Sequence, residues 1–290
     1  MKNSSNKLSC EKSQLNFLYL SDEILKIYAS DGYFSRGKNI RTKMSDIIGY
    51  HLSISKDIVH SISSITDLLH NASLVHDDII DNDKIRRGQS SIWKKYGVGK
   101  AILLGDYLIS KSYQEVALMN LCYGEKTKLN DEITKTLKDS VKGAHLELEH
   151  SDQTLETTFN NYIEISSLKT GSLFSLPFRC LYNMYDKFDS NEKRSLSKAF
   201  CNLAVSYQIK DDWLDFKSSE IHTDSNSDYI NNRPNIFNIM GRKYTEDLEA
   251  LIHRTQKDII LNSFNTIKCF NTDLFNDLKV CLNKFINFSI

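Results

Sequence analysis

Hydrophobic positions recur every three or four residues along most of the chain, which is the spacing of one buried face of an α-helix. The segments that follow this pattern are 58–80, 100–119, 131–149, 160–175, 196–214 and 236–290. Gly97, Gly124 and the polar run 151–157 predict breaks between helices, and the polar residues 218–234 predict a loop. No segment alternates clearly in the manner of a strand, so the pattern predicts an all-α fold.

Composition supports a globular helical chain. The chain has 290 residues, of which 40% are hydrophobic and 26% are charged, so it is too apolar for a disordered protein. Eleven glycines and two prolines are few for this length, which favours long helices over strands and turns. Because no repeat, low-complexity tract or linker divides the chain, we expect residues 1–290 to form a single large helical bundle.

Charge and cysteine content limit the possible binding partners of the protein and the cellular compartment in which it works. Lysine plus arginine and aspartate plus glutamate both number 37, so no overall field attracts nucleic acid or an anionic membrane. No apolar run reaches the roughly 18 residues of a transmembrane segment. The cysteines form no C-x-x-C pair, which predicts reduced thiols packed as small hydrophobic groups in a cytoplasmic protein. Lys2, Lys7 and nearby serines leave a short organellar transit peptide as the weaker alternative.

Two motifs of the form D-D-x-x-D stand out. The first runs from Asp77 to Asp81 and the second from Asp211 to Asp215. On a helix the first and last aspartates of each motif lie about 40° apart and one turn apart, so they share a face. Carboxylates placed in this way can converge on Mg²⁺, which also takes phosphate oxygens as ligands. The arrangement predicts a diphosphate held through magnesium between two aspartate walls.

A single motif of this kind is more typical of a solvated acidic helix face than of a metal site. Both motifs, however, end strongly apolar stretches, where the helix dipole disfavours negative charge, so a compensating cation is expected. The middle residues, Asp78 and Asp212, point about 100° away from their partners. They are therefore either outer ligands or surface residues.

Basic residues near the first motif can bind further phosphate. Arg86 and Arg87 follow the motif and carry forked donors that match phosphate oxygens. Upstream, Lys38 and Arg41 add two positive charges three residues apart. His70 precedes the motif on nearly the same helix face, although a lone histidine on an apolar helix is more often a core residue.

These motifs, in this order and spacing, strongly resemble the trans-isoprenyl diphosphate synthases, the polyprenyl synthetase family. The matching segments are G-K-N-I-R from Gly37, L-H-N-A-S-L-V-H-D-D-I-I-D from Leu69, R-R-G from Arg86, L-G-D from Leu104, K-T-G-S-L-F from Lys169 and Y-Q-I-K-D-D from Tyr207. The match extends over most of the chain. The resemblance implies the all-α isoprenoid synthase type I fold with a central cavity, in a homodimer or, as in some relatives, a heterodimer.

The resemblance also implies an activity and a role for each residue. The activity is the condensation of isopentenyl diphosphate with an allylic diphosphate (dimethylallyl, geranyl, farnesyl or geranylgeranyl), with about three magnesium ions as cofactor. The principal metal ligands would be Asp77, Asp81 and Asp211, supported directly or through water by Asp78, Asp212 and Asp215. The allylic diphosphate would be held by Arg86, Lys169, Thr170 and Gln208, and isopentenyl diphosphate by Lys38, Arg41, His70 and Arg87. The residues implied in catalysis are Asp77, Asp81, Asp211, Lys169 and Arg86.

The loop after the second motif departs from the family pattern. Related synthases carry a lysine in this loop, whereas residues 221–225 contain none, and a later G-K pair is replaced by Asn232 and Arg233. Arg233 can still bind phosphate, but the missing lysine leaves the allylic site one positive charge short. Pro234 beside it stiffens the loop.

Product length depends on how far the growing chain can extend past the first motif. Ser73 lies one helical turn before Asp77, and Ala72 is its neighbour. In short-chain relatives one of these positions is often aromatic and closes the cavity. Two small residues therefore favour a medium or long linear product, longer than C20, and the alternative is a geranylgeranyl or farnesyl diphosphate synthase.

Three other functions share part of this pattern. A class I terpene cyclase shares the fold and the first motif, but Asp215 and the residues expected to hold isopentenyl diphosphate argue against cyclisation. An HD phosphohydrolase is suggested only by the pair His76 and Asp77, and it leaves the second motif unexplained. A regulatory subunit of a heterodimeric synthase would do no chemistry. Two intact motifs disfavour that role, and the altered loop favours it.

Overall fold

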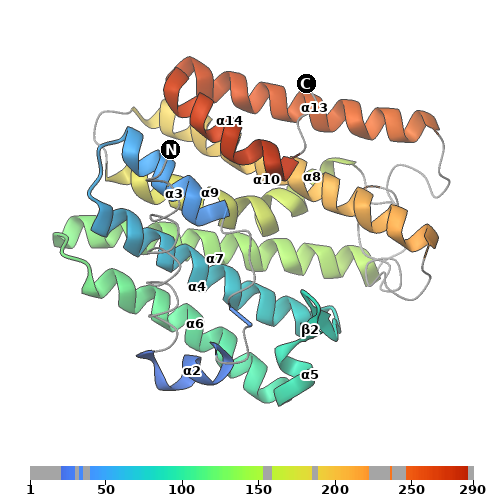
Figure 1. Cartoon of the computed structure of the whole chain (residues 1–290), viewed down its shortest axis with the longest axis horizontal. Coiled ribbons are helices and arrows are strands. Elements are labelled where there is room, and N and C mark those ends of the chain that lie inside the picture. The colour runs from blue at the N-terminus through green and yellow to red at the C-terminus, as the bar shows by residue number, and fades with distance from the viewer. Residues whose placement is uncertain are drawn as a thin grey trace, which may run out of the picture. The chain divides into compact units, whose positions relative to one another are not determined.

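The computed structural model describes residues 21–29, 33–34, 40–152, 159–184, 189–221, 236 and 246–286, with only the backbone of 151–152, 215–221, 246–248 and 284–286. Lys38 and Arg233 lie outside the described residues, and so does the side chain of Asp215. Apart from one short hairpin, the described chain consists of helices, which confirms the predicted all-α class (Figure 1).

The elements are α2 (Glu23–Ala29), α3 (Ile40–His51), α4 (Lys56–Ile80), β1 (Ile85–Arg86), β2 (Gln89–Ser90), α5 (Ile92–Tyr96), α6 (Val98–Leu118), α7 (Tyr123–Asp152), α8 (Phe159–Ser166), the π-helix η1 (Ser167–Gly171), α9 (Ser172–Asn183), α10 (Ser190–Ile221), α13 (Glu246–Phe270) and α14 (Thr272–Ile286). In the part of the chain that the structure describes, no helix combines the length and hydropathy needed to cross a bilayer.

The chain forms two compact units. Unit 1 comprises the described parts of residues 1–39 together with residues 71–108, and unit 2 comprises the described parts of residues 40–70 and 109–290. Helix α4 begins in unit 2 and ends in unit 1. The single bundle domain expected from the sequence stays a prediction.

Unit 1 contains α2, the last turns of α4, the β1–β2 hairpin, α5 and the first half of α6. A Cβ atom on Gly105 would lie 2.1 Å from Nε2 of His76, so the glycine is what lets α6 approach α4 closely. The same Nε2 lies 3.4 Å from the carbonyl oxygen of Ile102 and 3.6 Å from Oδ1 of Asp106. His76, half of the H-D pair in the sequence, thus packs against α6.

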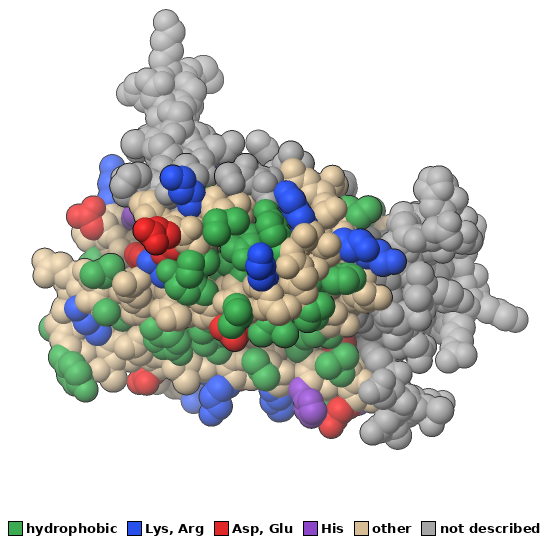
Figure 2. Space-filling model, turned by 90° about the horizontal axis from the view of Figure 1, so that it is seen from below, with side chains coloured by type: hydrophobic (Ala, Val, Ile, Leu, Met, Phe, Trp, Pro, Cys, Tyr) green, Lys and Arg blue, Asp and Glu red, His purple; other side chains and the backbone are tan. Residues whose placement is uncertain are grey.

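Unit 1 also exposes hydrophobic side chains. Those on α2 and α6 are Ile24, Ile27, Val98, Ile102, Leu103. Hydrophobic side chains gather over much of the face that Figure 2 shows.

Unit 2 is held together by an aromatic core. Phe178 stacks on Phe200 with ring centroids 4.4 Å apart and contacts Tyr182 at 4.0 Å, and Tyr182 in turn reaches Phe270. These rings come from α9, α10 and α13, and α10 packs against both α9 and α13 (Figure 1). Burying several large rings supplies much of the hydrophobic driving force for this unit.

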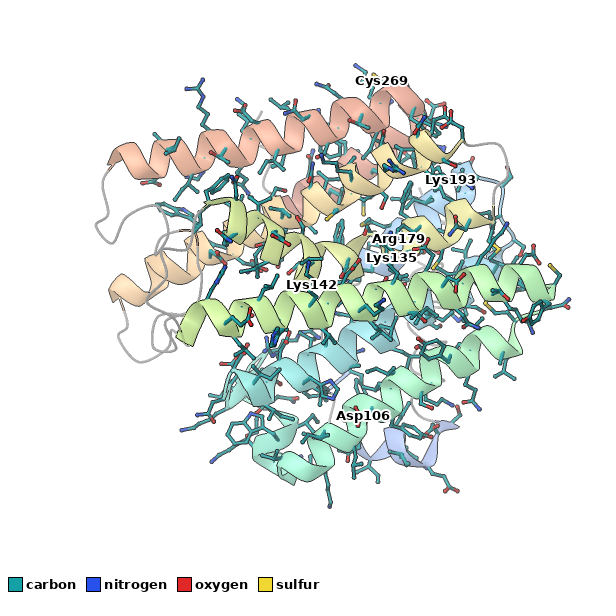
Figure 3. The ribbon with its side chains drawn as sticks, turned by 180° about the vertical axis from the view of Figure 1, so that it is seen from behind. Asp106, Lys135, Lys142, Arg179, Lys193 and Cys269 are labelled. Atoms are coloured by element: carbon teal, nitrogen blue, oxygen red, sulfur yellow. The ribbon has the colours of Figure 1, made fainter. Side chains whose placement is uncertain are left out.

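A buried polar network ties α9 to α7 within unit 2. The Nε atom of Arg179 donates to Oε2 of Glu132 at 2.7 Å, and its other nitrogens donate to Thr136 and Ser175. Asn183 donates to the second carboxylate oxygen of Glu132 at 3.0 Å. Figure 3 shows Arg179 where α9 passes α7. Because every charge in this network is paired, its burial is tolerated.

The helices differ from the predicted segments at several ends. The break predicted near Gly124 lies directly before it, between the end of α6 at Leu118 and the start of α7 at Tyr123, and Gly124 itself lies in the first turn of α7. The segment predicted from residue 160 to 175 is interrupted by η1 and continues to Asn183. Helix α10 continues to Ile221, so the second aspartate motif lies inside a helix and the dipole argument applies to the first motif only. Periodicity cannot detect such ends, because the repeat continues through them.

The cysteines differ in part from the expectation. Cys180 is buried, and burial raises the pKa of its thiol to about 12. Cys122 and Cys269 are exposed, so they are not packed as small hydrophobic groups. All five described cysteines are free thiols.

Candidate active site

The first aspartate motif occupies the end of α4. Asp77 is half-buried and Asp81 is 9% exposed, and the backbone N–H of Asp81 donates to the carbonyl of Asp77 at 2.7 Å. The helical hydrogen-bond pattern therefore continues through the motif, which keeps its first and last carboxylates on one face as predicted.

Asp78, the middle aspartate, faces in a different direction. Its side chain is 0% exposed and is held by two donors. Nε of Arg86 donates to Oδ1 at 2.6 Å, with Nη2 of the same guanidinium in contact with that oxygen, and the hydroxyl of Tyr33 donates to Oδ2 at 3.2 Å. Asp78 is therefore not a surface residue.

The β1–β2 hairpin places Arg86 against Asp78. Arg87 and Gly88 both have positive φ, of 53° and 77°, as in the two-residue turn that joins tightly twisted strands. The turn pairs Arg86 with Gln89 and leaves Arg87 exposed. The R-R-G motif thus divides its roles: one arginine turns inward, one faces solvent, and the glycine takes the left-handed backbone.

The protonation states in this cluster follow from burial and charge. Burial raises the pKa of Asp78, and the adjacent Arg86 guanidinium opposes that rise. Burial, followed by the neighbouring Asp78 carboxylate, raises the pKa of the Tyr33 hydroxyl. Tyr33 therefore keeps its proton at all ordinary pH values and acts as a hydrogen-bond donor.

Lys169 lies on the π-helix η1, where the helix is locally widened. Its Nζ donates to Oε2 of Glu147 on α7 at 2.6 Å, and both side chains are mostly buried. A Cβ atom on Gly143 would lie 2.6 Å from the backbone nitrogen of Lys169, so glycine is required there for η1 to lie against α7. Gly143 and Glu147, one turn apart, together determine where this lysine lies.

A chain of hydrogen bonds connects η1 to the second aspartate motif. The Thr170 hydroxyl donates to Oε1 of Gln208 at 3.2 Å, and Nε2 of Gln208 donates to Oδ1 of Asp212 at 2.9 Å. The other oxygen, Oδ2, accepts from the backbone N–H of Ile236 at 3.2 Å. Asp212 is 3% exposed, so it too is not a surface residue.

Tyr162 of α8 borders the second motif from inside the protein. Burial raises the pKa of its hydroxyl well above the ordinary value, and the Asp212 and Asp211 carboxylates add to the rise. Asp211 itself is half-buried on α10. The middle aspartate of each motif is thus surrounded by neutral or positive hydrogen-bond donors.

The remaining predicted residues are distributed over both units. Arg41 on α3 and His70 on α4 are half-buried in unit 2, and Arg87 is exposed in unit 1. On α4, Ala72 is buried and Ser73 is half-buried.

Magnesium suits the donors of both motifs. Asp77 and Asp81 offer only oxygen ligands one turn apart on α4, which is the ligand type that this cation prefers. Asp211 offers the same ligand type in unit 2. Among the described residues, no three histidine, cysteine or acidic side chains lie together as a metal cluster. The two motifs belong to different units.

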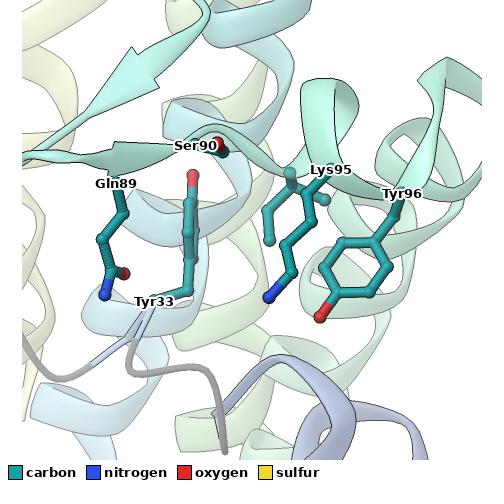
Figure 4. A pocket seen from close by; sticks show the side chains of 6 residues that line it. Tyr33, Gln89, Ser90, Lys95 and Tyr96 are labelled. Atoms are coloured by element: carbon teal, nitrogen blue, oxygen red, sulfur yellow. The ribbon is translucent and has the colours of Figure 1, made fainter.

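A pocket of about 240 Å³ lies beside Tyr33 in unit 1 (Figure 4). It is lined by Tyr33, Gln89, Ser90, Ile92, Lys95, Tyr96. The Tyr33 ring stands between Gln89 and Lys95, with its hydroxyl end directed toward the β1–β2 hairpin.

Sequence reasoning missed Tyr33 and Glu147. Tyr33 is 45 residues away from Asp78, and Glu147 is 22 residues away from Lys169. Neither lies in a motif. Only Gly143, one turn before Glu147, carries a local signal of close helix packing.

A comparison with protein-family models and a comparison with known proteins point to the same family. The family model described as polyprenyl synthetase matches residues 23–262. A geranylgeranyl diphosphate synthase from Sulfolobus acidocaldarius is 30% identical over 206 residues, which cover 70% of this chain and 62% of that protein. A prenyl transferase from Porphyra purpurea is 29% identical over 250 residues, or 83% of this chain and 75% of that protein. The chain spans less than two thirds of the length of the Sulfolobus synthase.

Solved structures show the same fold. A geranyltransferase from Helicobacter pylori, complexed with magnesium and isoprenyl diphosphate, superposes with a TM-score of 0.80 at 20% identity and covers 98% of this chain and 96% of its own. A geranylgeranyl pyrophosphate synthetase from Geoglobus acetivorans gives a TM-score of 0.81 at 17% identity, covering 97% and 96%.

Proposed function

Because the chain belongs to the polyprenyl synthetase family, we propose that it is a trans-prenyltransferase that condenses isopentenyl diphosphate with an allylic diphosphate. The observation that carries this proposal is a common arrangement of three side chains. Arg86, Lys169 and Gln208, which the resemblance assigns to the allylic diphosphate, are each held by a carboxylate that is wholly or mostly buried. Donors fixed in this way need little reordering when a diphosphate binds.

We assign the metal to Asp77 and Asp81 on one wall and to Asp211 and Asp215 on the other. When bound, magnesium would stabilise the negative charge that develops on the departing diphosphate. Asp78 binds Arg86 and Asp212 binds Gln208 in the structure. In this proposal the two aspartates therefore position those side chains and do not bind the metal directly.

The side chains of this protein would divide the remaining work. Arg86 and Lys169 would donate to the leaving diphosphate, so that the allylic C–O bond breaks and leaves a carbocation. The double bond of isopentenyl diphosphate, held by Arg41, His70 and Arg87 together with Lys38, would attack that carbon. Loss of a proton to the retained diphosphate completes the new double bond, so no nucleophilic side chain is needed.

Product length belongs to the same proposal. Ala72 and Ser73 are small, so neither closes the path below Asp77, and we propose a linear product longer than C20. The names of the relatives include geranylgeranyl, C20, synthases, and that length is the alternative.

The proposal includes a homodimer, or a heterodimer with a second synthase subunit, in the cytoplasm. The exposed hydrophobic side chains of α2 and α6 support an assembly of more than one chain.

The test is an elongation assay. Purified protein, magnesium and labelled isopentenyl diphosphate are incubated in turn with dimethylallyl, geranyl, farnesyl and geranylgeranyl diphosphate, and the dephosphorylated products are sized. We expect a linear ladder that is at least about 100-fold weaker in Asp77→Ala and Asp211→Ala proteins, because each removes a metal ligand.

Each other outcome has a defined meaning. A ladder that stops at C20 would contradict the long product and leave the condensation intact. Cyclic hydrocarbons formed without isopentenyl diphosphate would indicate a cyclase. No incorporation with any primer would contradict a homomeric synthase and direct attention to a partner subunit.

A further inference from the structure

We propose that Tyr33 is a positioning residue that orients Arg86 through Asp78. The inference rests on the proposed function, because it gives Arg86 its task of binding the allylic diphosphate. Tyr33 lies outside every motif of the sequence, and its hydroxyl contacts Asp78, the middle aspartate of the first motif.

The geometry assigns one carboxylate oxygen to each donor. Arg86 binds Oδ1 of Asp78 through Nε and Nη2, and Tyr33 binds Oδ2. Nη2 also lies 3.3 Å from Oδ2 of Asp83. A guanidinium has five N–H donors. Within the described residues, the contacts of Arg86 with Asp78 and Asp83 use the edge formed by Nε and Nη2. The side chain is 27% exposed, so we assign Nη1, which these contacts do not use, to the diphosphate.

Tyr33 is what prevents the carboxylate from turning. Asp78 is wholly buried, so each of its oxygens must find a donor inside the protein. Without the hydroxyl, Oδ2 would lose its donor, and the carboxylate would rotate to share both oxygens with Arg86. A bidentate pair through the same Nε and Nη2 edge would turn the guanidinium plane and so move Nη1 out of its present direction.

Phenylalanine is a clean replacement at this position. The ring of Tyr33 is 8% exposed and forms a wall of the pocket in Figure 4, and Phe keeps that ring while it removes only the hydroxyl. Tyr107 supplies a matched control in the same unit, because its hydroxyl also donates to a carboxylate, Oδ2 of Asp22 at 2.8 Å, and not to Asp78.

The experiment combines Tyr33→Phe with Arg86→Lys. For the wild type, both single variants, the double variant and Tyr107→Phe, we would measure the Kd of inorganic diphosphate with magnesium by calorimetry. The same proteins provide KM for the allylic substrate, kcat, the half-saturating magnesium concentration and the thermal midpoint.

We expect Tyr33→Phe to weaken diphosphate binding and raise KM about fivefold, with kcat and half-saturating magnesium within about twofold. Arg86→Lys should cost about tenfold or more, because lysine cannot reproduce the fork. In the Arg86→Lys background Tyr33→Phe should add less than about twofold, since it acts through the missing guanidinium. Tyr107→Phe should change neither constant.

Several results would overturn the inference. One is an unchanged Kd for diphosphate in Tyr33→Phe, and another is a full fivefold effect of Tyr33→Phe in the Arg86→Lys background. A third is a larger change in half-saturating magnesium than in KM for Tyr33→Phe, which would make Asp78 a metal ligand. A wild type that binds diphosphate but elongates no primer would contradict the proposed function alone. A wild type that binds no diphosphate would contradict both.

Discussion

At the scale of single residues, acidic side chains determine where the basic and amide groups of the candidate site lie. Asp78 holds Arg86, Glu147 holds Lys169, and Asp212 holds a glutamine. In each case the acidic group lies deeper than the group it holds or is comparably buried. A diphosphate would therefore meet donors that are already oriented, at the cost of competing with a carboxylate for their charge.

The pair Lys169 and Glu147 can be tested by a double-mutant cycle. Their side chains are 22% and 16% exposed, so the pair lies between surface and interior, and we expect a coupling energy of about 1–2 kcal/mol. Glu147→Gln and Lys169→Gln should each lower the free energy of unfolding, and the double variant should lose less than their sum, because no unpaired charge is left. Urea unfolding of the four proteins measures this. Strict additivity would mean that the ion pair contributes nothing.

At the scale of elements, close approaches between helices carry the functional side chains into place. The π-helix η1 lies against α7 because Gly143 has no side chain, and α6 approaches α4 because Gly105 has none. The β1–β2 hairpin turns at Arg87 and Gly88, which directs Arg86 inward. The R-R-G and L-G-D motifs therefore include glycines whose task is backbone geometry, at Gly88 and Gly105.

Gly143→Ala tests the contact between η1 and α7. The added Cβ would lie 2.6 Å from the backbone nitrogen of Lys169 and 2.9 Å from Cβ of Leu168, and backbone cannot move aside cheaply. We expect a loss of about 1–3 kcal/mol in the free energy of unfolding, measured in urea by circular dichroism. Gly124→Ala is the control on the same helix, because nothing lies within 4 Å of its Cβ. It should be neutral or stabilising by up to about 1 kcal/mol, and equal effects at both positions would refute the packing argument.

At the scale of the whole molecule, each unit carries its own set of candidate residues, and α4 has residues in both units. Unit 1 holds the first aspartate motif with Arg86, and unit 2 holds the second motif with Lys169 and Gln208. The aromatic core supports part of the second set, because α10 carries Phe200 of that core as well as Gln208 and the second aspartate motif.

Phe200→Ala tests that core. Phe200 is 0% exposed and stacks on Phe178, so removal of the ring should cost about 3–5 kcal/mol through lost burial and a cavity. Fluorescence of Trp213, followed during urea unfolding in a Trp93→Phe background, reports on unit 2. Leu251→Ala, at a position 47% exposed on α13, should change stability by about 0.5 kcal/mol or less. A similar midpoint in both variants would contradict the assigned core.

The all-α class, the main helices and the two aspartate motifs could be predicted because all three depend on local spacing. A repeat of three to four residues indicates a helix whatever surrounds it, and residues four apart share a face as soon as the helix forms. The sequence by itself therefore determined that Asp77 lies over Asp81. It also determined the order of the motifs, which is a property of the chain and not of its packing.

Tertiary structure alone decided which groups meet. Tyr33 and Asp78 are 45 residues apart, and Glu147 and Lys169 are 22 apart, so neither pair leaves a periodic signal in the sequence. It also decided that Asp78 and Asp212 turn inward, because a helical wheel gives the angle between side chains but not which side faces the core. Burial supplies that direction, since a carboxylate placed inside must be met by donors from other elements.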